Sequence, residues 1–164
     1  MLFRSDPHLD QLDRYIALAN ERGMRIHYVV ETHTHADHFS AARELGKQLG
    51  ANVVMHRLSA APFPDGRVDD GESLIVGKMR VRVMHTPGHS PGHVAYHLPA
   101  EKILIGGDLI IMGAVGRTDL PDSDQAELNR SLRTVMQLPD DTQILGGHGQ
   151  PSTIKQERAT NLYV

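Results

Sequence analysis

The chain carries a polar segment, THTHADH at residues 32–38, directly after a hydrophobic run, RIHYVVE at residues 25–31. The run is rich in β-branched and aromatic residues, which predicts a buried strand. His33 and His35 are two positions apart, and side chains at this spacing point the same way on an extended backbone. Two imidazoles can therefore face one metal ion, while Asp37 and His38 can face a second position beside it. The candidate ligands of this segment are His33, His35, Asp37 and His38.

Helical and strand patterns alternate on both sides of this segment. Asp6 and Pro7 predict the start of a first helix, as an N-cap followed by proline at N1, and Gly23 predicts its end. Further helices are expected over residues 39–49 and 124–138. Residues 57–71 are rich in Pro, Gly and Asp and are expected to be loop. Strands are expected at residues 52–56, 74–76, 79–85, 93–98, 102–106 and 143–145. The pattern predicts an α/β layered domain over residues 1–164.

Three more candidate ligands lie in the same context, on short glycine-containing loops after strand-like runs. His89 lies in TPGHSPGH, Asp108 in GGD and His148 in GGHG. Glycine lets the backbone approach a crowded site. A lone aspartate such as Asp108 is more often a turn residue than a ligand, but the repeated context favours the ligand. The ends of strands are also where open α/β sheets place ligands.

The chemistry of the donors narrows the kind of site. The chain has no cysteine, so a metal must be held by nitrogen and oxygen. Imidazole and carboxylate suit zinc, iron or manganese. His56, His85 and His93 lie closer to the predicted site and could orient the ligands. Arg117, in the polar segment GRTD, either binds an anionic substrate or pairs with an acid.

Composition excludes other classes of function. The chain has 164 residues and a formal net charge of -3, with no basic stripe to attract nucleic acid. No apolar stretch approaches the length of a membrane span, and the N-terminus has no signal-peptide pattern. We therefore expect a cytoplasmic protein that acts on a small molecule, without a nucleic-acid or membrane partner.

The four motifs THTHADH, TPGHSPGH, GGD and GGHG, in this order, resemble those of the metallo-β-lactamase-fold superfamily. The resemblance runs over residues 6–161, nearly the whole chain. It implies an αβ/βα sandwich with the metal site at one edge, between two β-sheets. Two branches of the superfamily are similar to this chain and imply different chemistry.

The glyoxalase II-like branch implies two divalent metal ions, with zinc expected first. One ion would take His33, His35 and His89, the other would take Asp37, His38 and His148, and Asp108 would bridge them. Asp37 and Asp108 would be catalytic, and a metal-bound hydroxide would attack a thioester or a related ester or lactone. The persulfide dioxygenase branch instead implies one iron, held by His33, His89 and Asp108, that oxidises glutathione persulfide.

The chain departs from the superfamily pattern at its ends. It begins almost at the first predicted helix, so the first N-terminal strands of the sandwich are expected to be missing. Because a bare sheet edge can pair with another chain, a homodimer through exposed edge strands is expected. A truncated relative that binds metal without turnover is a third possibility. The resemblance to glyoxalase II also implies a helical C-terminal domain that holds glutathione, and because few residues follow His148, a glutathione thioester is not the substrate that we expect.

Overall fold

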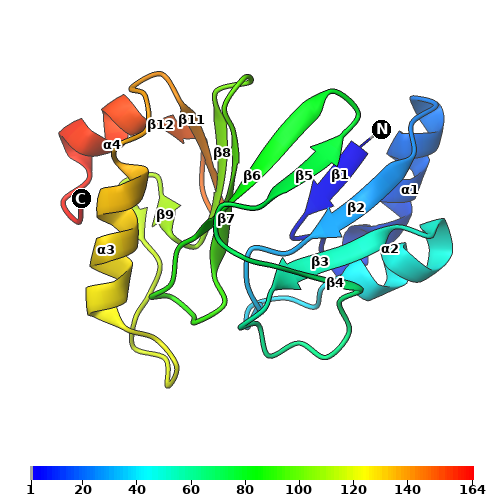
Figure 1. Cartoon of the computed structure of the whole chain (residues 1–164), viewed down its shortest axis with the longest axis horizontal. Helices are drawn as coiled ribbons and strands as arrows, with labels where there is room; N and C mark the ends of the chain where they lie inside the picture. Colours follow the sequence, from blue (N-terminus) through cyan, green and yellow to red (C-terminus); the bar gives the residue numbers. More distant parts are fainter. Residues whose placement is uncertain (1) are drawn as a thin grey trace.

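The computed structural model describes residues 2–164, in which two larger β-sheets pack face to face between helices (Figure 1). The first sheet has four parallel strands in the order β1-β2-β3-β4. These strands are β1 (Leu2–Ser5), β2 (Ile26–Val30), β3 (Asn52–His56) and β4 (Gly66–Val68). The 3-10 helix η1 (Leu9–Gln11) and the helices α1 (Leu12–Glu21) and α2 (Ala42–Leu49) belong to this half.

The second sheet has six strands in the order β12-β11-β8-β7-β6-β5. Within the described chain, β8 and β11 are the only neighbouring strands of this sheet that run parallel, and the other pairs are antiparallel. Its strands are β5 (Ser73–Val76), β6 (Met79–His85), β7 (Val94–Leu98), β8 (Ile103–Gly107), β11 (Gln143–Gly146) and β12 (Ser152–Thr153). The remaining elements are β9 (Ile110–Ile111), β10 (Ala114–Val115), α3 (Gln125–Val135) and α4 (Ile154–Thr160).

Alternating side chains of the strands build the layers. Val29 of β2 packs with Leu45 of α2 on the helix side of the first sheet. Its neighbour Val30 points to the other face and joins Tyr96 of β7 in the core between the sheets. On the far face of the second sheet, strand residues pack against α3 and α4. The order is therefore helix, sheet, sheet, helix, as the expected αβ/βα sandwich requires (Figure 1).

The structure corrects the expected start of the chain. Asp6 is not a helix N-cap: it has a positive φ of 44°, and its carboxylate accepts hydrogen bonds from the backbone and hydroxyl of Thr32. Regular helix begins only at Leu12, after η1. The strand β1, which was not expected, pairs with β2 and makes one edge of the first sheet. Pairing through this edge in a homodimer stays a prediction.

The other differences are small. The expected loop at residues 57–71 contains β4, whose three residues are too few to show an alternating pattern. The second helix begins at Ala42 rather than at residue 39, and it ends as expected at Gly50, which has a φ of 62°. The predicted strands, the β5–β6 hairpin and the helix after Asp124 are confirmed. No helix within residues 2–164 is long and apolar enough to cross a membrane.

Candidate metal centre

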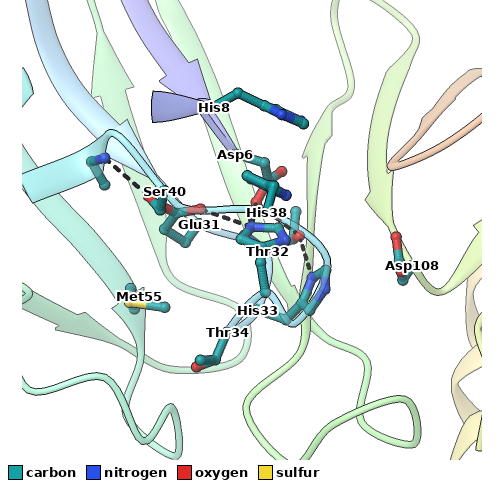
Figure 2. A network of polar contacts seen from close by, with 12 residues as sticks. Asp6, His8, Glu31, Thr32, His33, Thr34, His38, Ser40, Met55 and Asp108 are labelled. Atoms are coloured by element: carbon teal, nitrogen blue, oxygen red, sulfur yellow. Dashed lines mark hydrogen bonds and ion pairs between the residues drawn. The ribbon is translucent and has the colours of Figure 1, made fainter. Parts of the chain in front are cut away.

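All seven predicted ligands lie around one edge of the sandwich. The loop between β2 and α2 carries four of them, and the other three follow β6, β8 and β11. Six of the seven line a cavity of about 250 Å³, together with Asp6 and His8. Asp108 directly follows β8 of the second sheet and faces the loop of His33 across this cavity (Figure 2). The site therefore joins residues from both sheets.

The first group of ligands is His33, His89 and Asp108, whose donor atoms lie within 4.8 Å of one another. His89 Nε2 lies 3.8 Å from Asp108 Oδ2, and the rings of His33 and His89 have centroids 4.9 Å apart. His33 and His89 are both buried. This group offers two nitrogens and one oxygen to a single ion.

A second group lies beside the first and consists of His35, Asp37 and His38, again within 4.8 Å. His148, which follows β11 of the opposite sheet, lies next to this group, since its Nε2 is 3.4 Å from Asp37 Oδ2. The same nitrogen lies 3.7 Å from Asp108 Oδ2. The carboxylate of Asp108 thus faces a histidine of each group, where a bridging ligand would have to lie.

Three of the candidate histidines, His33, His89 and His38, each keep one ring nitrogen that is available to a metal ion. His33 Nδ1 lies 2.9 Å from Thr32 Oγ1, and His89 Nδ1 donates to the carbonyl of Arg117 at 2.9 Å. His38 Nε2 is buried and has no hydrogen-bond partner among the described residues. Because an unpaired buried polar atom is costly, this nitrogen fits a metal ligand. The donor set suits zinc or iron.

Two carboxylates, those of Asp6 and Glu31, hold the ring of His35. Its Nε2 lies 3.0 Å from Asp6 Oδ1 and 2.9 Å from Glu31 Oε2, which leaves Nδ1 on the side of Asp37. Burial opposes protonation of His35, but the hydrogen bonds and charges of Asp6 and Glu31 outweigh it and raise the pKa of the ring to about 10. Burial raises the pKa of Glu31 to about 7, and Ser40 donates a hydrogen bond to this carboxylate (Figure 2).

Sequence reasoning missed this pair of carboxylates. Asp6 was interpreted as a helix cap, and Glu31 as the last residue of a strand. A charged residue at the end of a buried hydrophobic run was the one available signal, since such a residue needs a partner. His8, to which the sequence pattern gave no role, stacks on His38 with ring centroids 3.7 Å apart.

His93 contacts the backbone of the candidate ligand Asp108. It is fully buried, its Nδ1 lies 2.8 Å from Thr86 Oγ1, and its Nε2 accepts a hydrogen bond from the backbone N–H of Asp108 at 3.1 Å. A side chain on Gly107 would meet this ring, since a Cβ there would lie 2.8 Å from Nε2. His93 thus positions the backbone of a ligand, as the sequence suggested that it could. His56 and His85 instead stack on each other, with centroids 4.0 Å apart.

Mild acid should destabilise the metal-free protein. Burial lowers the pKa of His33 to about 2, of His56 to about 4 and of His93 to about 3, from an ordinary value of 6.5. These groups stabilise the fold fully above pH 6.5, and the stabilisation is lost as pH falls from 6.5 towards their folded-state pKa. Glu31 and His35, whose pKa values are raised, oppose this loss, most strongly above pH 6. Below pH 6 the three histidines outweigh these two groups, so the free energy of unfolding should fall by at least about 1 kcal/mol per pH unit between pH 6 and pH 5.

Urea unfolding of the metal-free protein at pH 6.0, 5.5 and 5.0 measures this effect. A lower midpoint at each step down in pH is expected. Equal midpoints at the three values would show that these histidines are not held in their neutral form by the fold.

Arg117 lies beside the site, but its side chain faces solvent and an acid. The guanidinium pairs with Asp119 through two bonds of 2.6 and 2.7 Å. Its backbone carbonyl, rather than its charge, contacts the ligand His89. Of the two sequence interpretations, the acid pair is thus present, and binding of an anionic substrate stays a prediction.

The chain is similar to proteins whose names give an activity. A hydroxyacylglutathione hydrolase of Rhizobium etli is 34% identical over 132 residues, which cover 79% of this chain and 51% of that protein. The mitochondrial persulfide dioxygenase ETHE1 of Homo sapiens is 33% identical over 162 residues, which cover 95% of this chain and 63% of that protein. The chain therefore spans only about half to two thirds of the length of these two relatives.

A solved structure and a family model extend the comparison. The structure of TTHA1623 in a di-iron-bound form matches with a TM-score of 0.87 and 32% identity, covering 98% of this chain and 88% of the other. The model of the metallo-beta-lactamase superfamily matches residues 5–148, a range that contains all seven ligands. The chain therefore belongs to the metallo-β-lactamase superfamily.

Proposed function

We propose that the protein is a metal-dependent hydrolase of the glyoxalase II-like type, acting on a thioester or a related ester or lactone. The observation that carries this proposal is the second ligand group. A single ion would need only His33, His89 and Asp108, whereas His35, Asp37, His38 and His148 provide donors for another ion beside it. The similarity to the hydroxyacylglutathione hydrolase supports the same activity.

Two bound divalent cations would act as Lewis acids and bring the pKa of water near neutrality. Asp37 is the residue placed to handle the proton: its carboxylate is about half exposed, with 46% of the side chain accessible, and opens into the cavity. It would orient the attacking water and accept its proton. The water oxygen adds to the substrate carbonyl carbon, the carbon–sulfur bond breaks, and the thiol leaves with the proton that Asp37 held. Asp108 would keep both ligand groups at a fixed separation.

Metal content tests this proposal directly. Protein purified without added metal should contain about two zinc or mixed ions per chain and hydrolyse thioesters. Removal of the ions by a chelator should abolish hydrolysis, and returning zinc, iron or manganese should restore it. Hydrolysis that survives complete removal of the metal would contradict the proposal.

The second candidate is a persulfide dioxygenase with one iron. The compact group of His33, His89 and Asp108 favours it, and so does the similarity to the human enzyme. In this case, protein with about one iron per chain should consume oxygen when glutathione persulfide is added. A third candidate, a metal-binding relative without turnover, predicts bound metal but neither activity.

A further inference from the structure

A second pocket adjoins the metal centre on the side of His89. It has a volume of about 330 Å³ and lies between the loops that follow β2, β3, β6 and β10. Its walls include Thr34, Leu58, His89, Pro91, Leu120 and Asp122. Neither the sequence motifs nor the proposed chemistry assigns a role to this space.

His89 connects the pocket with the reacting centre. Its Nε2 belongs to the first ligand group with His33 and Asp108, while the same side chain lines the pocket. Thr34, which also lines the pocket, lies between the ligands His33 and His35 in the chain. A substrate with its carbonyl at the first ligand group would therefore have one substituent beside this pocket.

The walls are mainly apolar and carry little charge. Leu58 is 55% exposed and Leu120 is half-buried, and both face the pocket together with prolines and an alanine. Thr34 has its hydroxyl paired with Ser59 at 3.1 Å. Among the described lining residues there is no lysine or arginine, and the one carboxylate is that of Asp122. An anionic group would find no cation here and would meet a negative charge.

The exposed Leu58 is held on an anchored loop. The guanidinium of Arg67 donates to three backbone carbonyls around it: those of His56 at 3.2 Å, Ser59 at 2.8 Å and Ala61 at 2.6 Å. An exposed leucine on a fixed loop, at the wall of a preformed pocket, is typical of a ligand site. Because these hydrogen bonds hold the loop in place, the exposure of Leu58 is a fixed feature of the pocket wall.

We propose that this space, hereafter the Leu58 pocket, binds the uncharged aliphatic acyl chain of the substrate. The proposal rests on the proposed hydrolase function and adds the substrate class: acyl groups without a carboxylate, preferred in order of increasing length until the pocket is filled. Burial of each methylene should raise kcat/KM about three- to fourfold, because the apolar surface leaves water.

The first experiment compares acetyl, butyryl, hexanoyl and succinyl thioesters of one neutral thiol, with the metal-loaded protein. kcat/KM should rise from acetyl to hexanoyl, and the succinyl ester should be slower than the butyryl ester of the same length. In Leu58→Ser and Leu120→Ser the dependence on chain length should weaken. Leu18→Ser is the matched control, because Leu18 is 42% exposed on α1 and should leave the dependence unchanged.

The second experiment separates the pocket from the chemistry. Straight-chain primary amides of the same lengths are not thioesters, and calorimetry measures their binding to the metal-loaded protein. Affinity that rises with length, and falls in Leu58→Ser but not in Leu18→Ser, supports the pocket even if no thioester is hydrolysed, in which case the hydrolase proposal alone fails. A flat series, or equal loss in both variants, overturns the Leu58 pocket whether or not thioesters are hydrolysed.

Discussion

Asp37→Ala is expected to lower kcat/KM for thioester hydrolysis by about 10²–10⁴-fold, the usual contribution of a positioned proton-transfer group. Asp37 Oδ1 lies 3.1 Å from His38 Nδ1, and Oδ2 lies 3.4 Å from His148 Nε2, so the change also removes the carboxylate of the second ligand group. Bound metal should fall from about two ions towards one per chain. The side chain is 46% exposed, so unfolding of the metal-free protein should change little.

Asp141→Ala is the control for this prediction. Asp141 pairs with Lys102 at 2.5 Å, just before β8, whereas the ligand Asp108 follows the other end of that strand. Loss of this exposed pair should leave hydrolysis and metal content unchanged. If Asp37→Ala kept both full hydrolysis and two ions, Asp37 would be neither a ligand nor the proton acceptor.

The largest loss of stability is expected for Gly88→Ala. Gly88 has a φ of 134°, and a Cβ on it would lie 2.3 Å from the backbone nitrogen of Leu128 in α3. Its carbonyl also accepts the N–H of Asp124, at the start of the same helix. Backbone strain and overpacking each cost about 1–3 kcal/mol, so the free energy of unfolding should fall by about 2–6 kcal/mol. Because His89 is the next residue, metal affinity should fall as well.

Gly71→Ala separates the two causes. Gly71 also has a positive φ, 78°, but a Cβ on it would meet nothing within 4 Å. This variant should lose only about 1 kcal/mol, from backbone strain. Urea unfolding of both variants gives the comparison. Equal losses would show that the contact between Gly88 and α3 is not tight.

The candidate ligands that the structure brings together could be found in the sequence because each one is marked locally, by a strand-like run before it and by glycine or a second candidate beside it. The layered fold followed from the alternation of helical and strand patterns. The partners of His35 were not predictable in the same way. Asp6 is 29 positions from His35 in the chain, and only the pairing of β1 with β2 brings them together. β1 itself has four residues, too few for a pattern to emerge.

How the ligands divide between two ions stays a prediction. The resemblance implied that His35 shares an ion with His33 and His89, and the structure places donor atoms of His35 within 4.8 Å of those of Asp37 and His38, and also of those of Asp6 and His33. Spacing along the chain cannot decide this, because it does not fix which ring nitrogen faces the cavity. That choice depends on Asp6 and Glu31, which occupy Nε2 of His35.

Because the ligand groups combine side chains of both sheets, a bound ion is also a cross-link between two halves of the sandwich. Separation of the halves would require release of the ion, so binding and folding share one equilibrium. At a free metal concentration 100 times the Kd, this linkage adds about 2.7 kcal/mol to the stability of the native state. The fraction of molecules open to proteolysis would fall accordingly, and the lifetime of the protein in a cell would depend on the supply of metal.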